Sequence, residues 1–319
     1  MTCPVCRGTD VEPFAQARDI EYCTSAERFS YARCRACATV FLERPPVGRL
    51  REIYPSNYYS YRSSDRPSLV ERLKQRLDGR LFRRLLAELP GDELAVLDVG
   101  GGTGWLLSVA RAQDARVRVT HELDIDESAR AGAEAAGHVF HCQRAEEFVP
   151  PRRFDLVILL NLIEHVTDPE RVLSTLATAL SDGGLMLLKT PNTDTLDCRL
   201  FRHRSWGGFH CPRHWVLFTR ETLAALARRC GLEPVWIRYT QGAPQWAPSL
   251  LGWLADHGVV TVSAGRPMYR HPLYAPLLAA TAAFDYARLP FAPTAQMFGL
   301  FRRRTAQVGV AAGEASRPG

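Results

Sequence analysis

The segment Leu97-Asp-Val-Gly-Gly-Gly-Thr-Gly-Trp105 decides the fold of this 319-residue chain. It begins inside an apolar run, residues 94–99, whose length and composition predict a buried strand. Glycines let a backbone turn tightly and approach a ligand, and the helix expected from about residue 105 would point its N-terminal N–H groups at that ligand. The segment therefore predicts a ligand-binding loop between a strand and a helix.

Spacing separates this loop from the dinucleotide-binding loops that also use glycine. It holds one aspartate and four glycines, at Asp98, Gly100, Gly101, Gly102 and Gly104. A dinucleotide fingerprint has the spacing G-x-G-x-x-G and lacks this aspartate. Roughly 20 residues further on, Asp124 ends a second apolar run, at a position where a carboxylate accepts ribose hydroxyl protons.

The loop resembles motif I of the class I S-adenosylmethionine-dependent methyltransferases, which is close to L-D-x-G-x-G-x-G. The resemblance implies S-adenosyl-L-methionine as the cofactor, with Asp124 holding its ribose and Ile125 beside its adenine. Glu122 and Asp126, the other acids of this segment, are interpreted as solvated side chains. The resemblance also implies a Rossmann-like fold and enzymatic methyl transfer.

The segment Arg144-Ala-Glu-Glu-Phe148 extends the resemblance. Relatives commonly carry an acidic residue followed by Ala-Glu here and contact the adenine. Arg144 replaces that acid in this chain, whereas Ala145 and Glu146 keep the matching residues and are expected at the cofactor.

Residues 154–169 resemble the fourth strand and the following loop of the same superfamily, which often contains L-E-H-x-x-D-P. Ligands of open α/β sheets bind beyond the carboxyl ends of the strands. Asn161 and Leu162 are therefore expected against the cofactor. Glu164 and His165 are expected near the reaction site, with a purely structural role in fixing the next helix as the alternative.

Four of the nine cysteines form two C-x-x-C pairs, at Cys3, Cys6, Cys34 and Cys37. Thiolates at this spacing share one tetrahedral ion, so the pairs predict a Zn²⁺ site, with unligated thiols as the alternative. Four sulfur ligands leave no open position for a substrate, which indicates a structural ion. The segment between the pairs is too short to build a core, so the metal would supply much of its folding energy.

Strands and helices alternate between residues 91 and 240, which predicts a doubly wound, mostly parallel α/β sheet. Leucines at every fourth position between residues 69 and 85 predict a helix with an apolar face and a basic opposite face. The expected domains are a zinc ribbon at 1–45, an aromatic loop and basic connecting helix at 46–90, the cofactor domain at 91–240, a helical cap plus last strand at 241–305, and a disordered tail at 306–319.

The acceptor needs a group that removes its proton if methylation occurs at a hydroxyl or a carbon acid. The segment from His210 to Phe218 resembles a P-R-H-x-x-x-F-T segment of relatives. Sugar C-methyltransferases, which also carry a four-cysteine zinc domain, have a catalytic Glu-His pair there. His214 matches that histidine, and Arg213 stands at the position of the glutamate. We therefore expect His214 to be the general base, with His210 and His165 as further candidates, or His214 to cap a helix or close the cofactor site.

Two aromatic segments are candidates for the mouth of the site. A tyrosine-rich segment is expected to cover the cofactor or the substrate mouth, or to pack the zinc ribbon on the main domain; its members are Tyr54, Tyr58, Tyr59 and Tyr61. The insertion at 241–290 is expected to form an apolar acceptor pocket or a dimer surface.

These features favour a cytoplasmic enzyme that methylates oxygen or carbon of a small molecule, such as a sugar or a natural-product intermediate. Two alternatives stay open: an RNA methyltransferase that grips phosphates with the ribbon and the basic helix, and a zinc-ribbon adaptor without catalysis. The net charge of +6 is too modest to favour a nucleic acid, and no apolar stretch is uniform enough to span a membrane. A homodimer is left open.

Overall fold

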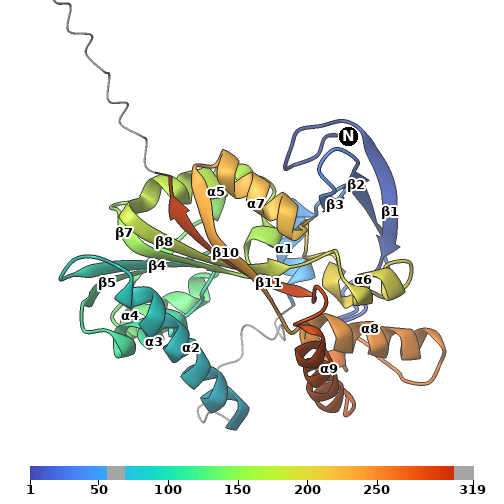
Figure 1. Ribbon diagram of the computed structural model, residues 1–319. Helices are drawn as coiled ribbons and strands as arrows, with labels where there is room; N and C mark the ends of the chain where they lie inside the picture. Colours follow the sequence, from blue (N-terminus) through green and yellow to red (C-terminus); the bar gives the residue numbers. More distant parts are fainter. Residues whose placement is uncertain (56–68, 305–319) are drawn as a thin grey trace, which may run out of the picture.

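The computed structural model describes residues 1–55 and 69–304, and the side chains of the helix that begins at Leu69 from residue 75 onward. A seven-stranded sheet with the order β10-β11-β8-β7-β4-β5-β6 forms its centre (Figure 1). Its strands are β4 (Leu94–Val99), β5 (Val117–Asp124), β6 (Val139–Cys142), β7 (Phe154–Leu160), β8 (Leu180–Pro191), β10 (Leu232–Thr240) and β11 (Gln296–Arg303). Neighbouring strands among β4 to β8 pair in parallel, and β11 is antiparallel to both of its neighbours. The predicted α/β class is confirmed.

The strand order reverses at β4, which places the binding crevice. From β4 the chain adds β5 and β6 on one side, and then returns to place β7 on the other side of β4. Loops that leave β4 and β7 therefore diverge at the carboxyl edge of the sheet, where open α/β folds bind their ligands. This edge carries the glycine loop after β4 and Asn161 after β7.

Helices cover both faces of the sheet because strand residues alternate between the two faces. The helices are α1 (Leu50–Ile53), α2 (Leu69–Ala87), α3 (Trp105–Gln113), α4 (Arg130–Ala135), α5 (Pro169–Ala179), α6 (Leu196–Phe201), α7 (Arg220–Arg229), α8 (Ala243–Asp256) and α9 (Tyr274–Arg288). On one face, α2 and α3 pack on alternate residues of β4, β7 and β8, and on the other face α5 and α7 pack on the remaining ones (Figure 1).

The apolar face of α2 differs from the expected leucine row. Phe82, Leu85 and Leu86 are buried against the sheet, whereas the side chain of Leu77 is half exposed. Toward its N-terminus the helix projects away from the sheet (Figure 1), so a place in the every-fourth-residue row does not bury Leu77. Contact with the sheet, rather than the leucine spacing, therefore decides which residues are buried.

The four-cysteine unit, residues 1–45, is less separate than the expected boundary implies. Its strands β1 (Val11–Ala17), β2 (Phe29–Cys34) and β3 (Val40–Leu42) are antiparallel. A fourth strand, β9 (Val216–Leu217), pairs with β3 and comes from the loop that precedes α7. The sheet of the unit is therefore completed by a distant part of the chain.

A buried ion pair joins the same two parts. Asp19, after β1, and Arg213, before β9, are both inaccessible to solvent, and Nη2 of the arginine lies 2.9 Å from Oδ2 of the aspartate. Arg213 also donates to the carbonyl oxygens of Ile53 and Cys211. Burial raises the pKa of Asp19, but the Arg213 charge and several hydrogen bonds outweigh burial and leave the pKa below its usual value.

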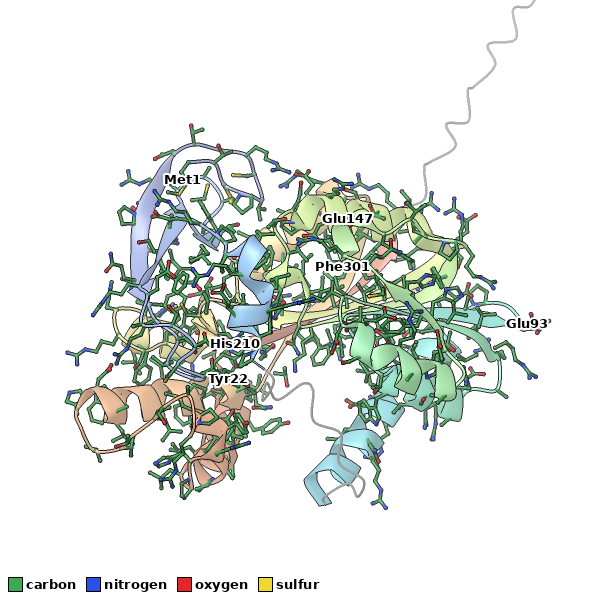
Figure 2. All side chains as sticks on the ribbon, turned by 180° about the vertical axis from the view of Figure 1, so that it is seen from behind. Met1, Tyr22, Glu93, Glu147, His210 and Phe301 are labelled. Carbon is green, nitrogen blue, oxygen red and sulfur yellow. The ribbon has the colours of Figure 1, made fainter. Side chains whose placement is uncertain are left out.

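The insertion is helical, as expected, and consists of α8 and α9 packed on each other at one end of the molecule (Figures 1 and 2). None of the helices within residues 1–55 and 69–304 is both long enough and apolar enough to cross a bilayer.

Replacing Asp19 with asparagine should lower the free energy of unfolding by about 3–5 kcal/mol, because Arg213 would remain buried without its counter-charge. Urea unfolding at pH 7 measures this. Glu12→Gln, which breaks an exposed pair with Arg35, is the control and should cost less than about 1 kcal/mol. The pKa of Asp19 is depressed in the folded state. Its contribution to the free energy of unfolding should therefore persist above the ordinary pKa of 3.8 and be lost as the pH falls below that value. Equal losses in the two variants would contradict this assignment.

Candidate functional site

Two carboxylates at the end of β5 hold the glycine loop in shape. Gly101 N–H donates to Oε1 of Glu122 at 2.8 Å, and Gly102 N–H donates to Oδ2 of Asp124 at 3.0 Å. A Cβ atom on Gly101 would lie 2.1 Å from Oδ2 of Asp98, so no larger residue fits there. Gly100, Gly102 and Gly104 have φ between +64° and +81°, a region that glycine adopts without strain.

Glu122 corrects one expectation from the sequence. It was interpreted as a solvated acid, but it is fully buried beneath the loop beside Asp98. One oxygen of each carboxyl group, Oε2 of Glu122 and Oδ2 of Asp98, has no hydrogen-bond partner among the described residues. Burial and the nearby charge of Asp124 raise the pKa of Asp98, and burial and the nearby charge of Asp98 raise the pKa of Glu122. The alternation of a strand could have identified Glu122, since it shares a register position with Asp98 on β4.

A cavity of about 330 Å³ opens at the carboxyl edge of β4, β5 and β7. Seven predicted cofactor residues line it: Gly100, Asp124, Ile125, Ala145, Glu146, Asn161 and Leu162. Asp98, Gly101, Gly102 and Gly104 belong to the supporting loop and are not among the lining residues. Tyr58 lies outside the described residues. The lining also includes Tyr54, from the tyrosine-rich segment expected at the mouth of the site. Residues that the sequence did not single out, or placed in doubt, line it at Leu50, Asp126, Gln143, Arg144 and Trp215.

The cavity suits S-adenosylmethionine in shape and donor set. Each oxygen of Asp124 accepts one backbone hydrogen bond, from Gly102 or Asp126, and a carboxylate oxygen has capacity for more. Ribose hydroxyls are donors of the kind it would take. Asn161 holds φ = 53°, a left-handed conformation that asparagine tolerates, and its N–H donates to the carbonyl of Lys189. The glycine loop, Asp124 and Asn161 thus surround the space expected for the cofactor.

Glu146 is held by several hydrogen bonds beside the cavity. Its Oε1 accepts from Arg144 at 3.0 Å and from both the backbone and the hydroxyl of Thr167. Arg144, which replaces the acid of relatives, therefore holds Glu146 in place. These contacts tie the loop after β6 to the start of α5.

Three histidines gather at the end of the cavity that faces the four-cysteine unit. His165 lines the cavity, and its ring centroid lies 4.7 Å from that of His214 and 6.3 Å from that of His210. The two other rings lie 5.1 Å apart. His165 comes from the loop after β7, and the other two come from the segment before β9, so the fold unites candidates that the sequence separates.

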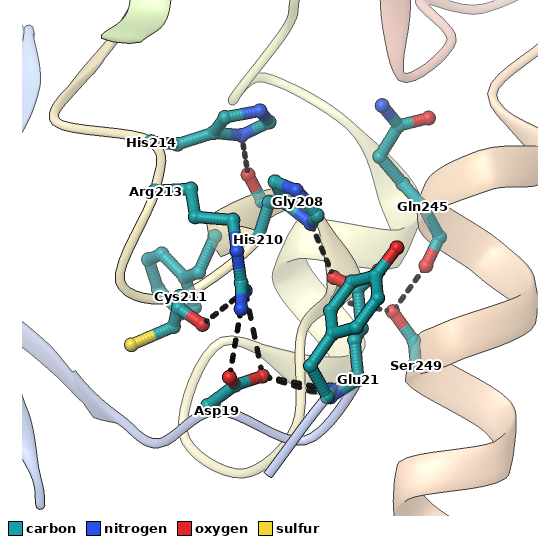
Figure 3. A network of polar contacts seen from close by, with 12 residues as sticks. Asp19, Glu21, Gly208, His210, Cys211, Arg213, His214, Gln245 and Ser249 are labelled. Carbon is teal, nitrogen blue, oxygen red and sulfur yellow. Dashed lines mark hydrogen bonds and ion pairs between the residues drawn. The ribbon is translucent and has the colours of Figure 1, made fainter. Parts of the chain in front are cut away.

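Different partners orient the three rings, and Figure 3 shows those of His210 and His214. Nδ1–H of His210 donates to Oε1 of Glu21 at 2.7 Å, and Nδ1–H of His214 donates to the carbonyl of Gly208 at 2.8 Å. Nδ1–H of His165 donates to the carbonyl of Arg213 at 2.9 Å, and the hydroxyl of Tyr54 lies 3.0 Å from the same nitrogen. In the neutral rings Nε2 is then the nitrogen that can accept a proton.

Burial shifts the pKa values of two of the histidines and of the neighbouring Glu164 in opposite directions, because it disfavours the charged form of each group. It lowers the pKa of His214 well below the ordinary value and, with the nearby His210, lowers the pKa of His165 to about 3. Burial also raises the pKa of Glu164 to about 8. Oε2 of Glu164 accepts from Thr190, while its Oε1 has no hydrogen-bond partner among the described residues and lies 3.9 Å from Nε2 of His214.

Within the described residues, two groups have the spacing of metal ligands. One consists of Glu164, His165 and His214 and lies at the cavity. The other is the predicted zinc set, whose Sγ atoms approach to 3.7 Å between Cys3 and Cys37 and to 3.5 Å between Cys6 and Cys34. Tetrahedral zinc with bonds near 2.3 Å places its sulfur ligands about 3.8 Å apart, so the four thiols fit this ion.

The backbone around the four cysteines supports the same assignment. Arg7 N–H donates to the carbonyl of Cys3, and Ala38 N–H donates to the carbonyl of Cys34. Arg7 and Ala38 both have left-handed φ, near +60°. The two C-x-x-C turns are therefore closed in the same way, and they present their thiols to a common point.

Comparisons with known proteins agree with this geometry. A family model described as a methyltransferase domain matches residues 69–236. The solved structure of coclaurine N-methyltransferase bound to N-methylheliamine and SAH aligns with a TM-score of 0.51 and 15% identity, over 81% of this chain and 82% of that one. At that identity the likeness shows the fold.

Curated relatives include proteins named ubiquinone biosynthesis O-methyltransferase. The relative from Bradyrhizobium sp. (strain ORS 278) is 36% identical over 107 residues, and the alignment covers 31% of this chain and 40% of that protein. The relative from Cereibacter sphaeroides (strain ATCC 17029 / ATH 2.4.9) is 27% identical over 202 residues, covering 60% of this chain and 77% of that one. The chain thus spans only 40% of the length of the Bradyrhizobium relative, and 56% of that of a third, from Parvibaculum lavamentivorans (strain DS-1 / DSM 13023 / NCIMB 13966).

Loss of one cysteine should remove the metal. Cys34→Ser protein should contain less than about a tenth of the zinc of the wild type, measured as metal per chain by mass spectrometry, because three thiolates leave the tetrahedral shell open. Its melting temperature should also fall, since the ion contributes folding free energy. Cys142→Ser, at an exposed single cysteine, is the control and should keep its zinc. Equal zinc contents in the two variants would rule out the proposed site.

Replacing Asp124 with asparagine should weaken S-adenosylmethionine binding by about 10–100-fold in calorimetric titration, since a hydrogen bond to a charged group contributes about 1.5–3 kcal/mol. Glu127→Gln, at an exposed carboxylate after the same strand, should change the affinity less than about threefold. An unchanged affinity in Asp124→Asn protein that remains folded would remove Asp124 from the cofactor site.

Proposed function

Because the chain belongs to the methyltransferase domain family and is an S-adenosylmethionine-dependent methyltransferase, we propose that its acceptor is a hydroxyl group of a small molecule. The observation that carries this proposal is the histidine cluster next to the cofactor cavity. An alcohol or phenol must lose its proton as it gains a methyl group, and a cluster of oriented imidazoles supplies a place for that proton.

Different residues of the chain would bind the cofactor and align the acceptor. The bound cofactor supplies an electrophilic methyl group on a sulfonium. Asp124 and the glycine loop hold the nucleoside, and His165, Tyr54 and Trp215 border the side of the cavity where an acceptor would align with the methyl carbon. As the acceptor hydroxyl took up that methyl group, a histidine of the cluster would receive its proton. Correct alignment accounts for much of the acceleration in such a transfer.

His210 is a better general base than the expected His214 on the contacts that the two rings make. A carboxylate on Nδ1 orients an imidazole and stabilises its protonated form, and Glu21 occupies that place on His210. Nδ1 of His214 has a neutral backbone carbonyl as its partner instead. The depressed pKa of His214 also makes this ring a weak proton acceptor. Arg213, at the position of the glutamate of relatives, is committed to Asp19.

Oxygen is favoured over carbon because the curated relatives are named as O-methyltransferases. A sugar or a natural-product intermediate remains the proposed acceptor class. The experiment incubates the protein with methyl-labelled S-adenosylmethionine and, in separate arms, nucleoside-diphosphate sugars, polyketide-like alcohols and RNA. Mass analysis should locate the label on an oxygen of a small molecule. Label on RNA alone would contradict the proposal.

With an acceptor in hand, His210→Asn should lower kcat by about 10²–10⁴-fold while the Kd for S-adenosylmethionine stays within about twofold, because the variant loses only proton transfer. Glu21→Gln should lower kcat by a smaller factor, since the ring remains but loses its charged partner.

His214→Asn is the comparison variant, and it should retain more activity than His210→Asn. A chelator that leaves turnover unchanged would show that Glu164, His165 and His214 act without an ion. If His214→Asn abolishes turnover and His210→Asn does not, the base is His214.

A further inference from the structure

The helix α9 exposes an apolar side, whereas a surface helix usually exposes polar residues. Its buried side chains are Thr281 and Asp285, and Leu277 and Leu278 next to them are partly buried. Its exposed side is built from Ala279, Ala280, Ala283, Phe284 and Tyr286, and continues to Phe291, whose side chain is 88% exposed; we call this surface the α9 face.

Polar contacts add to the apolar packing that holds α9, in which the ring of Phe284 meets that of Trp246 edge to face. Oδ2 of Asp285 accepts from the N–H of Gly242 at 2.7 Å, and its Oδ1 accepts from Nε1 of Trp246 at 3.2 Å. Arg288 completes the neutralisation of Asp285 at 2.9 Å. The orientation of α9 is therefore fixed by specific contacts to the start of α8. It keeps an apolar side outward, and an exposed apolar surface of this kind marks an interaction site.

The charges around the α9 face have one sign. Residues 257–292 contain a single acid, the buried and paired Asp285. The exposed charged side chains in this stretch are Arg266 and Arg270. The basic helix α2, with exposed Arg76 and Arg80, projects from the same end of the molecule in both overall views (Figures 1 and 2).

We propose that the α9 face is the surface by which this protein binds an anionic lipid membrane. The small and aromatic side chains would enter the outer part of the bilayer, and the arginines of the cap and of α2 would meet the headgroups. The contact would be that of an interfacial helix, which lies in the plane of the membrane surface.

The pattern of charge distinguishes a membrane from a second copy of the chain. Two α9 faces brought together would juxtapose Arg266 and Arg270 with the same residues of the other copy, and residues 257–292 offer no exposed acid to pair with them. Phosphate headgroups provide that charge, and the adjoining acyl chains accommodate the alanines and aromatic rings.

Vesicle flotation of the full chain tests the proposal. Wild-type protein should float with vesicles of phosphatidylglycerol and phosphatidylcholine and bind several-fold less to phosphatidylcholine alone. The double variant Ala279→Glu/Ala283→Glu should bind the anionic vesicles about tenfold less, because it places two negative charges on the apolar surface.

The matched control is Ala131→Glu/Ala135→Glu, which makes the same changes at the same spacing on exposed positions of α4. It should bind like the wild type. Equal losses in both variants, or no binding by the wild type, would overturn the proposal. So would a wild-type dimer that only the α9 variant dissociates in sedimentation equilibrium. Should the α9 variant unfold, Phe291→Ser, in the turn beyond the helix, replaces it. The flotation result does not depend on which acceptor is methylated.

Discussion

The buried pair of Arg213 and Asp19 is the contact on which the candidate site depends. A guanidinium without solvent must have its charge and its donors satisfied, and here Asp19, Ile53 and Cys211 do so from three parts of the chain. The same arginine lies between the rings of Tyr22 and Tyr54, with its central carbon 4.7 Å and 6.0 Å from their centroids. His214 and β9 follow it directly. One residue thus fixes the four-cysteine unit, the wall of the cavity and the histidine segment relative to one another.

This arrangement gives the four-cysteine unit a role in the site beyond stability. Glu21, which orients His210, belongs to the unit, and Tyr31 of β2 donates to the carbonyl of His214 at 3.0 Å. A metal-bound fold with no open coordination position is rigid, and rigid support is what an oriented proton acceptor needs. A zinc ion in the four-cysteine unit would therefore affect proton transfer only indirectly, through the residues that this unit holds in place.

The sequence was informative wherever function depends on local spacing. The alternation of strands and helices, the glycine loop, the cysteine pairs and Asp124 all follow from residues close together in the chain. It was uninformative where partners are distant: nothing local connects Glu21 with His210, or Asp19 with Arg213, and β9 is too short for its period to be recognised. Glu122 was misjudged because an acid beside an exposed turn is usually solvated, whereas the packing of β4 on β5 buries it. The orientation of α9 likewise depends on a tertiary contact, that of Asp285 with α8.

The completion of the N-terminal sheet by β9 has a consequence for biosynthesis. The four cysteines are synthesised before the segment that carries β9, and domains are generally expected to fold in the order of their synthesis. Here the edge of β3 stays unpaired until Val216 and Leu217 have been synthesised, which requires most of the methyltransferase domain to have emerged. An unpaired strand edge is a site of wrong association. The nascent chain therefore has an unpaired β3 edge while the residues between β3 and β9 are being synthesised. Early metal binding by the thiols would fold the rest of the four-cysteine unit during this time.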